Sequence, residues 1–182
     1  MASATLRECF TEWSVTPNLG MHSAPQAILA HAAGENSPTN PGRVNRYNAG
    51  IIEELYKAFH IPVIVQGELA IACRERNIPL TAVSKRQAEL VAPNYLDSRD
   101  MAIWQKGECD KIGATRVVLV SYYPHYWRAL KCTEKVGLTV LTPLRLRRMF
   151  DWRNSQWWAK FGAINQPYEL AARLEFYKNG WI

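Results

Sequence analysis

The stretch SYYPHYWRALK, residues 121–131, holds most of the side chains that could do chemistry in this sequence. It follows the apolar run VVLV, which is typical of a buried strand. Pro124 suits the first turn of a helix, because its fixed φ angle fits there and its missing N–H would have had no partner. We therefore expect a helix to start where a strand ends, with Ser121, His125 and Arg128 around that point.

These residue types in this order favour the binding of an anion. A helix N-terminus presents free backbone amides with partial positive charge, a serine hydroxyl can donate, and a guanidinium matches the geometry of phosphate or carboxylate. If a reaction follows, His125 is the candidate general acid or base. The alternative is that His125 packs in the core and Arg128 lies on a solvated helix face.

Asp97 lies in the stretch NYLDSRD, residues 94–100, for which two interpretations are open. In the first, Asn94 is the N-cap of a helix and the carboxylate of Asp97 only reaches back to its free amides. In the second, Asp97 is the carboxylate that orients His125. A hydrolytic triad of Ser121, His125 and Asp97 is a further alternative, but Ser121 has no G-x-S-x-G elbow around it.

Small and polar residues also follow two other predicted strands. The strand over 26–32 runs into a loop rich in turn formers, in which Gly34 comes early, and the strand over 61–65 is followed by Gly67 and Glu68. Ligands of open parallel sheets bind beyond the carboxyl ends of the strands. We therefore expect these three residues to belong to the same ligand site.

The predicted elements explain how such residues come together. Short apolar runs predict strands over 26–32, 61–65, 80–83, 116–120 and 138–141. Apolar residues three and four positions apart, together with turn and capping residues, predict helices over 43–59, 69–76, 94–112 and 124–136. Because strands and helices alternate, we expect an α/β fold with a Rossmann-like, mostly parallel sheet and helices on both faces.

The chain divides into an N-terminal extension over 1–25, an α/β domain over 26–143, and a C-terminal helical extension over 144–182 that packs on the same domain. The extension is predicted to hold two helices, over 152–161 and 168–178. The face of the second helix that we expect to pack consists of Leu170, Leu174, Tyr177 and Trp181.

Composition narrows the class of protein. The 182 residues are 48% apolar, which is enough for one domain with a sizeable core. The net charge of +6 favours anionic partners without choosing among nucleic acid, phosphorylated metabolites and anionic lipid. Four widely spaced cysteines suggest neither a metal site nor a disulfide framework. No run approaches the roughly 20 apolar residues of a membrane span, so we expect a cytoplasmic protein.

Several stretches occur in an order that is typical of one protein family. AILAHAAGEN is similar to its first strand and small-residue loop, NPGRVNRYNAGIIEELYKA to its arginine-bearing helix, and VIVQGE to its second strand and turn. YLDSRD resembles a helix start, and VVLVSYYPHYWRAL matches the motif Ser-x-x-x-His-x-x-Arg-Ala best. Over roughly residues 26–143 the chain thus resembles the YdcF, SanA and ElyC family of bacterial domains of unknown function.

This resemblance implies that a single pocket collects residues from several of these stretches. The implied residues are Gly67, Asp97, Ser98, Ser121, His125 and Arg128, with Arg46 nearby. It also implies S-adenosylmethionine as a candidate cofactor. We expect a protein that binds an anionic, nucleotide-like or phosphorylated small molecule, and whether catalysis follows stays open.

The C-terminal segment RLRRMFDWRNSQWW supports a different class of function. It interleaves basic and aromatic residues, as in modules that contact phosphates and stack bases of nucleic acid. The residues in question are Arg145, Arg147, Arg148 and Arg153 with Trp152, Trp157 and Trp158. Alternatively, the tryptophans pack on the sheet edge while the arginines stay in water, or the segment mediates oligomerisation.

Overall fold

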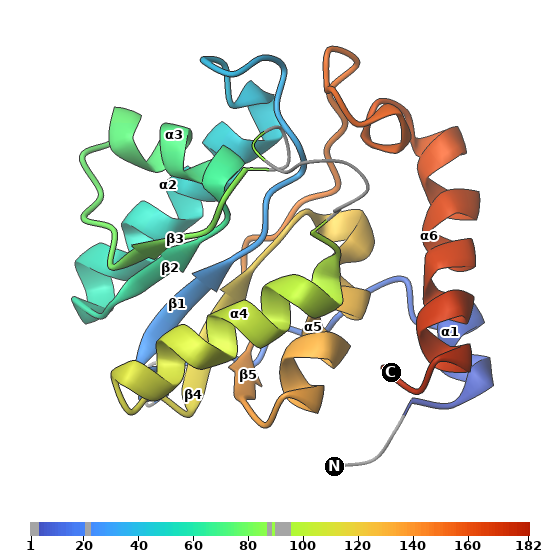
Figure 1. The fold of residues 1–182 in the computed structure, drawn as a ribbon, viewed down its shortest axis with the longest axis horizontal. Coiled ribbons are helices and arrows are strands. Elements are labelled where there is room, and N and C mark those ends of the chain that lie inside the picture. Colours follow the sequence, from blue (N-terminus) through green and yellow to red (C-terminus); the bar gives the residue numbers. More distant parts are fainter. Residues whose placement is uncertain (1–3, 21–22, 87–88, 90–95) are drawn as a thin grey trace.

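The computed structural model describes residues 4–20, 23–86, 89 and 96–182, and it contains one parallel sheet (Figure 1). Its strands are β1 (Ala27–Ala30), β2 (Val63–Val65), β3 (Ala82–Val83), β4 (Arg116–Val120) and β5 (Thr139–Leu141). All neighbouring strands pair in parallel, in the order β3-β2-β1-β4-β5. The predicted Rossmann-like α/β fold is confirmed, and the strand order reverses between β1 and β4.

Helices cover both faces of this sheet (Figure 1). They are α2 (Gly42–Phe59) and α3 (Gly67–Glu75) on one face, and α4 (Ser98–Lys111) and α5 (Tyr126–Lys135) on the other. Successive residues of a strand point to opposite faces, so Ile28 of β1 packs among α2 and α3 while Leu29 packs toward α4 and α5. Every residue of β1 is buried, as expected for a central parallel strand.

The register of the central strands determines which loops meet. Ala30 of β1 pairs with Val120 of β4 and with Val65 of β2. The residues that follow these positions therefore leave the sheet side by side, and the backbone N–H of His31 donates to the carbonyl of Val120 at 2.9 Å. This register brings the predicted strand ends to one edge of the sheet.

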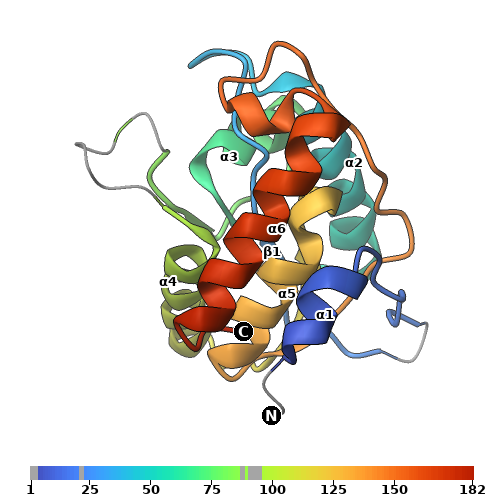
Figure 2. The same cartoon turned by 90° about the vertical axis from the view of Figure 1, so that its right-hand side faces the viewer.

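A third layer forms where the two ends of the chain meet. The helix α6 (Gly162–Lys178) packs over α5, and α1 (Leu6–Thr11) lies beside α6 (Figure 2). Cys9 of α1, Trp127 of α5 and Phe176 of α6 share one apolar cluster. The N-terminal segment is therefore part of the structure that supports α6.

The C-terminal segment differs from its prediction. The helix predicted over 152–161 is wrong, since this stretch holds only the short 3₁₀ helix η3 (Trp157–Ala159), and α6 begins six residues before the predicted start at 168. The rest of the segment bonds to the loop after β1 instead. Asn154 Nδ2 donates to the carbonyl of Ala33 at 2.6 Å, and the N–H of Ser155 donates to the carbonyl of Glu35 at 2.7 Å.

The packed face of α6 also differs from the prediction. Its buried residues are Asn165, Glu169, Arg173 and Phe176, whereas the predicted face of Leu170, Leu174, Tyr177 and Trp181 is only partly buried or exposed. The helix therefore buries a largely polar stripe. The partners of that stripe are described with the site.

Two helix starts are corrected as well. Asp97 is itself the N-cap of α4, because its Oδ1 accepts from the N–H groups of Arg99 and Asp100, while Asn94 lies outside the described residues. Pro124 belongs to the 3₁₀ helix η2 (Tyr123–His125), which precedes α5. Each correction moves a predicted start by a few residues without changing the order of the elements.

The four cysteines are buried as free thiols. Among the described residues, no helix combines the length and apolar character needed to cross a membrane.

Gly34 and Gly107 allow a matched test of this packing. Gly34 has a φ of 80°, and a Cβ there would lie 2.6 Å from Asn154 Oδ1, whereas a Cβ on Gly107 in α4 would meet nothing within 4 Å. Gly34→Ala should lower the free energy of unfolding by at least roughly 1–2 kcal/mol, the cost of a left-handed alanine. Gly107→Ala should raise it by about 0.5–1 kcal/mol. Urea unfolding of both variants measures these two changes. Equal changes in the free energy of unfolding would contradict the described geometry of the loop at Gly34.

Candidate functional site

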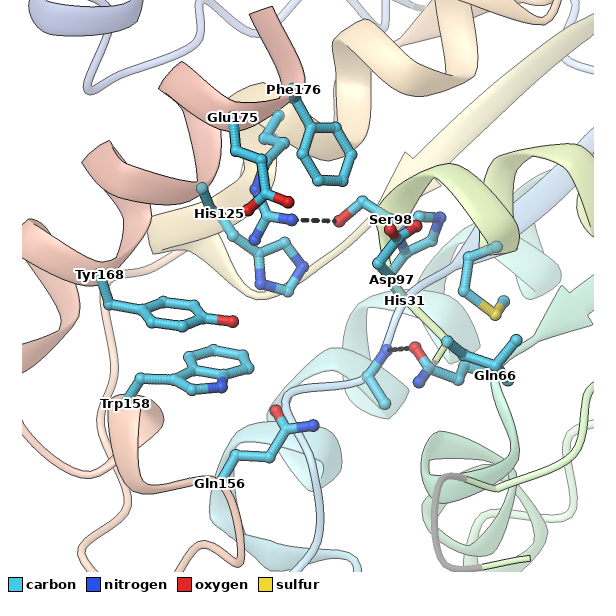
Figure 3. A pocket seen from close by; sticks show the side chains of 15 residues that line it. His31, Gln66, Asp97, Ser98, His125, Gln156, Trp158, Tyr168, Glu175 and Phe176 are labelled. Carbon is cyan, nitrogen blue, oxygen red and sulfur yellow. Dashed lines mark hydrogen bonds between the residues drawn. The ribbon is translucent and has the colours of Figure 1, made fainter. Parts of the chain in front are cut away.

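A cavity of about 210 Å³ opens at the carboxyl ends of β1 and β4, where the strand order reverses (Figure 3). Its lining comes from the loops after β1 and β2, the start of α4, the η2–α5 junction, η3 and α6. In open α/β sheets this reversal point is where two neighbouring loops diverge and leave a crevice. The cavity therefore lies where the fold itself favours a ligand.

Arg128 is the central cation of the cavity, and its guanidinium is held from two sides. Nε and Nη2 donate to the carboxylate of Glu169 at 3.0–3.3 Å, and Nη1 donates to Ser98 Oγ at 3.1 Å (Figure 3). The side chains of Arg128 and Glu169 are 7% and 1% exposed. Burial disfavours the guanidinium charge, but the Glu169 carboxylate outweighs burial and raises the pKa of Arg128. Arg128 is therefore a fixed, permanently charged group.

Glu169 has a second buried partner, Arg173, one turn later on α6. Arg173 Nε donates to Glu169 Oε1 at 3.2 Å, and its Nη1 donates to the carbonyl of Glu12 at 2.6 Å. Its guanidinium also lies 4.4 Å from the ring of Trp13 and 4.7 Å from that of Trp127. These three charges sum to +1, so the buried cluster of Arg128, Glu169 and Arg173 carries a net positive charge beside the cavity.

His125 lines the cavity with one ring nitrogen engaged and one without a partner. Nε2 lies 2.8 Å from Ser121 Oγ, whereas Nδ1 is buried and has no hydrogen-bond partner among the described residues. The residue is 5% exposed, and burial, followed by the charge of Arg128, lowers the pKa of His125 well below its usual value. The imidazole is therefore neutral at physiological pH, and within the described residues its Nδ1 stays without a hydrogen bond.

Of the two interpretations of Asp97 that the sequence left open, the structure favours capping over the orientation of His125. The Oδ1 of Asp97 caps α4 and the residue lines the cavity, but the group that holds the ring of His125 is Ser121. Since no residue that the structure describes bonds to Nδ1 of His125, Ser121, His125 and Asp97 are not arranged as a triad. Ser121 itself is 1% exposed and does not line the cavity.

Two further polar residues complete the buried part of the lining. His31 is 2% exposed, and its Nε2 lies 2.9 Å from Gln105 Oε1. Burial lowers the pKa of His31 to about 4. Gln66 Oε1 accepts from the N–H of Ala32 at 2.9 Å, which leaves its Nε2 group for the cavity (Figure 3).

Aromatic side chains form the opposite wall. The rings of Trp158 and Tyr168 stack with a centroid distance of 5.0 Å and an interplanar angle of 1° (Figure 3). Phe176 of α6 lies 5.1 Å from the guanidinium of Arg128. The cavity therefore combines a polar floor with an apolar wall, the composition that is usual for small-molecule sites.

The structure brings together only part of the predicted site. His125, Asp97, Ser98 and Arg128 line the cavity, whereas Ser121 lies directly behind His125. The remaining predicted residues lie outside the lining, and they are Gly34, Arg46, Gly67 and Glu68. Arg46 forms an ion pair with Glu75 on the surface of the α2–α3 face, with Nε 3.0 Å from Oε2 and both side chains about half exposed. Glu68, in contrast, is only 1% exposed.

Sequence reasoning missed Glu169, His31 and Gln66. A signal existed for both His31 and Gln66, because His31 lies at the end of the strand predicted over 26–32 and Gln66 directly follows the strand predicted over 61–65. For Glu169 the spacing to Arg173 suggests a pair within the helix, but nothing local points to Arg128. The aromatic wall had no local signal, since Trp158 lies in the stretch 152–161 that was wrongly predicted as a helix, and nothing near Tyr168 in the sequence indicates that its ring stacks on Trp158.

No family model matches the chain, and no curated protein matches it. The resemblance to the YdcF, SanA and ElyC family therefore stays a prediction, and the site has to be interpreted from its own geometry. Among the described residues, no three His, Cys, Asp or Glu side chains gather in a way that could hold a metal ion.

Glu169→Gln should destabilise the protein more than any exposed change on α6. The substitution keeps the size of the side chain but leaves Arg128 and Arg173 buried without a counter-charge, which typically costs about 3–5 kcal/mol. Glu175→Gln, an exposed change on the same helix, should alter the free energy of unfolding by about 0.5 kcal/mol or less. Urea unfolding of both variants measures these changes in the free energy of unfolding. A change for Glu169→Gln as small as that for Glu175→Gln would refute the stabilising role of Glu169 in the buried cluster.

Proposed function

We propose that the protein binds a small anionic molecule, nucleotide-like or otherwise phosphorylated, in the cavity at the reversal of strand order. The observation that carries this proposal is His125, a residue of the cavity lining whose buried Nδ1 has no hydrogen-bond partner among the described residues. A buried polar atom without a partner costs free energy that a bound molecule recovers. A ligand with a polar group at this nitrogen would remove that cost.

The donors around Arg128 favour an anionic group on the ligand. Its contacts to Glu169 and Ser98 leave one N–H on each Nη atom. Ser98 Oγ accepts from Arg128, so its own hydroxyl hydrogen is available, and Gln66 contributes its Nε2 group. Charge-assisted bonds from a guanidinium are the strong ones for phosphate or carboxylate oxygens. The net charge of +1 on the cluster behind the cavity adds to this preference.

The rest of the lining favours a nucleotide-like molecule rather than a bare anion. The aromatic wall of Trp158, Tyr168 and Phe176 offers apolar contact for a planar ring. Asp97 and Glu175 also line the cavity and can accept from hydroxyl or amino groups. S-adenosylmethionine, with a carboxylate, a base, ribose hydroxyls and a positive charge, is one molecule that would use all of these groups. If a reaction follows, His125 is the general acid or base.

The four buried thiols suit a reducing compartment, so we place this function in the cytoplasm.

Ligand binding can be tested with the purified chain by titration calorimetry against AMP, ADP and S-adenosylmethionine. Ser98→Ala should weaken binding about tenfold, because it removes one hydrogen bond to a charged group without opening the core. The control is Arg46→Ala, which changes an exposed arginine outside the cavity and should leave the affinity within about twofold. Absence of heat with all three ligands at millimolar concentration would sink the proposal, as would a loss seen only in the Arg46 variant.

A second candidate function is the binding of single-stranded nucleic acid by the segment 144–161. Trp152 and Trp157 are 64% and 58% exposed, and the guanidinium of Arg153 lies 4.7 Å from the ring of Trp152. Exposed aromatic rings next to arginines suit base stacking beside phosphate contacts. Trp158 would take no part, since it is 7% exposed and stacks on Tyr168.

Fluorescence anisotropy with a labelled single-stranded oligonucleotide tests this candidate. Binding should weaken steeply as salt rises, and Trp152→Ala with Trp157→Ala should reduce the affinity at least tenfold, since each stacked base contributes about 1–3 kcal/mol. Leu144→Ala, which changes a 74% exposed apolar residue of the same segment, is the control. No binding at low salt would remove this candidate and leave the cavity as the single site proposed.

A further inference from the structure

Gln105 of α4 connects the backbone of β1 to the ring of His31. Its side chain is fully buried, with Nε2 donating to the carbonyl of Ala30 at 3.3 Å and Oε1 lying 2.9 Å from His31 Nε2. A backbone carbonyl can only accept, so the NH₂ end of the amide has to face Ala30. The oxygen end therefore faces His31.

This orientation determines which nitrogen of His31 carries the hydrogen. An amide oxygen can only accept, so Nε2 of the ring has to donate to it. A neutral imidazole has a hydrogen on one nitrogen, and the hydrogen bond at one nitrogen sets the state of the other. Nδ1 of His31 is then a bare acceptor on a ring that lines the cavity.

The surroundings of His31 keep the ring neutral. Burial and, to a smaller extent, the positive charge of Arg128 lower the pKa of His31 to about 4, against the opposing effect of the hydrogen bond to Gln105. A protonated ring would present N–H groups on both sides, so neutrality is what preserves the acceptor.

We propose that Gln105 is a positioning residue that holds His31 as the neutral tautomer with its hydrogen on Nε2, so that Nδ1 accepts a hydrogen bond from a hydroxyl or amino group of the bound molecule. This deepens the proposed function and rests on it for the identity of the ligand. Gln66, Ser98 and Arg128 supply donors, whereas His31 supplies a neutral acceptor among them. The matching ligand class is an anion that carries a hydroxyl or amino group, such as a sugar phosphate or a nucleotide with free ribose hydroxyls.

The tautomer can be measured in the free protein by long-range ¹H–¹⁵N correlation spectroscopy of the histidine rings at pH 7. The chain has four histidines, and the His31→Gln variant assigns the signal of interest. The expected pattern is a protonated Nε2 and an unprotonated Nδ1. The opposite tautomer, or a ring protonated at both nitrogens, overturns the proposal.

Substitutions of Gln105 test whether this residue sets the tautomer of His31. Gln105→Glu places a carboxylate at Nε2 and should shift His31 toward the doubly protonated ring at pH 7. Gln105→Met offers Nε2 only the weak acceptor of a thioether and should give a mixture of tautomers. This variant tests the role of Gln105 if the glutamate variant does not fold. Glu108→Gln on the same helix, whose side chain bonds to Lys111, is the control and should leave the ring signals unchanged. A His31 ring that keeps its state in both Gln105 variants overturns the positioning role.

The proposed hydrogen bond from a ligand hydroxyl to Nδ1 of His31 is tested by comparing the affinities for AMP and 2′,3′-dideoxy-AMP. The wild-type chain should bind AMP at least tenfold more tightly than the dideoxy nucleotide. Equal binding to the wild-type chain overturns the assignment of Nδ1 to a ligand hydroxyl. Failure of AMP to bind at all counts against the proposed function, while the tautomer, measured without ligand, still decides the role of Gln105.

Discussion

The carboxylate of Glu169 lies between two buried guanidinium groups, and much of the structure around the cavity depends on this contact. Glu169 orients Arg128 toward Ser98 at the start of α4, and it shares its charge with Arg173. Arg173 in turn bonds to carbonyls of the N-terminal segment and contacts two tryptophan rings. A buried ion pair adds little net stability compared with apolar packing, but it strongly disfavours any arrangement that separates its partners. The cluster therefore specifies how α6 and α1 attach to the α/β domain.

The cavity itself follows from the strand order. Because β1 pairs with β4 on one side and β2 on the other, the residues after these strands diverge from one point at the edge of the sheet. Three side chains reach the cavity from there, those of His31, Gln66 and His125. The helix α6 closes the cavity from outside with Phe176 and with Tyr168, whose ring stacks on Trp158. A common α/β framework thus supplies the floor, and an addition at the C-terminus supplies the wall.

Two amide side chains beside the cavity are oriented by the backbone. The amide of Gln66 is oriented by the N–H of Ala32, and that of Gln105 by the carbonyl of Ala30. Backbone groups of a central strand cannot reorient, so the donors and acceptors offered to a ligand are set before it binds. Such preorganisation favours selectivity, because a molecule with the wrong pattern leaves buried groups unpaired.

The amino-acid sequence by itself determined the order of strands and helices in the α/β domain, its parallel sheet, and the placement of Ser121, His125 and Arg128 where a strand gives way to a helix. These features depend on local patterns: β-branched runs, helical periodicity, and turn residues that mark where a strand stops. Only the tertiary structure decided the face of α6 that packs, the role of Asp97 as a cap, and the positions of Arg46, Gly34, Gly67 and Glu68 outside the cavity. The physical reason is that apolar periodicity identifies a face buried by hydrophobic contact, whereas α6 buries Glu169 and Arg173 because their charges meet Arg128, a partner some forty residues earlier in the chain. A contact of that kind has no local signature, so folding alone brings its members together.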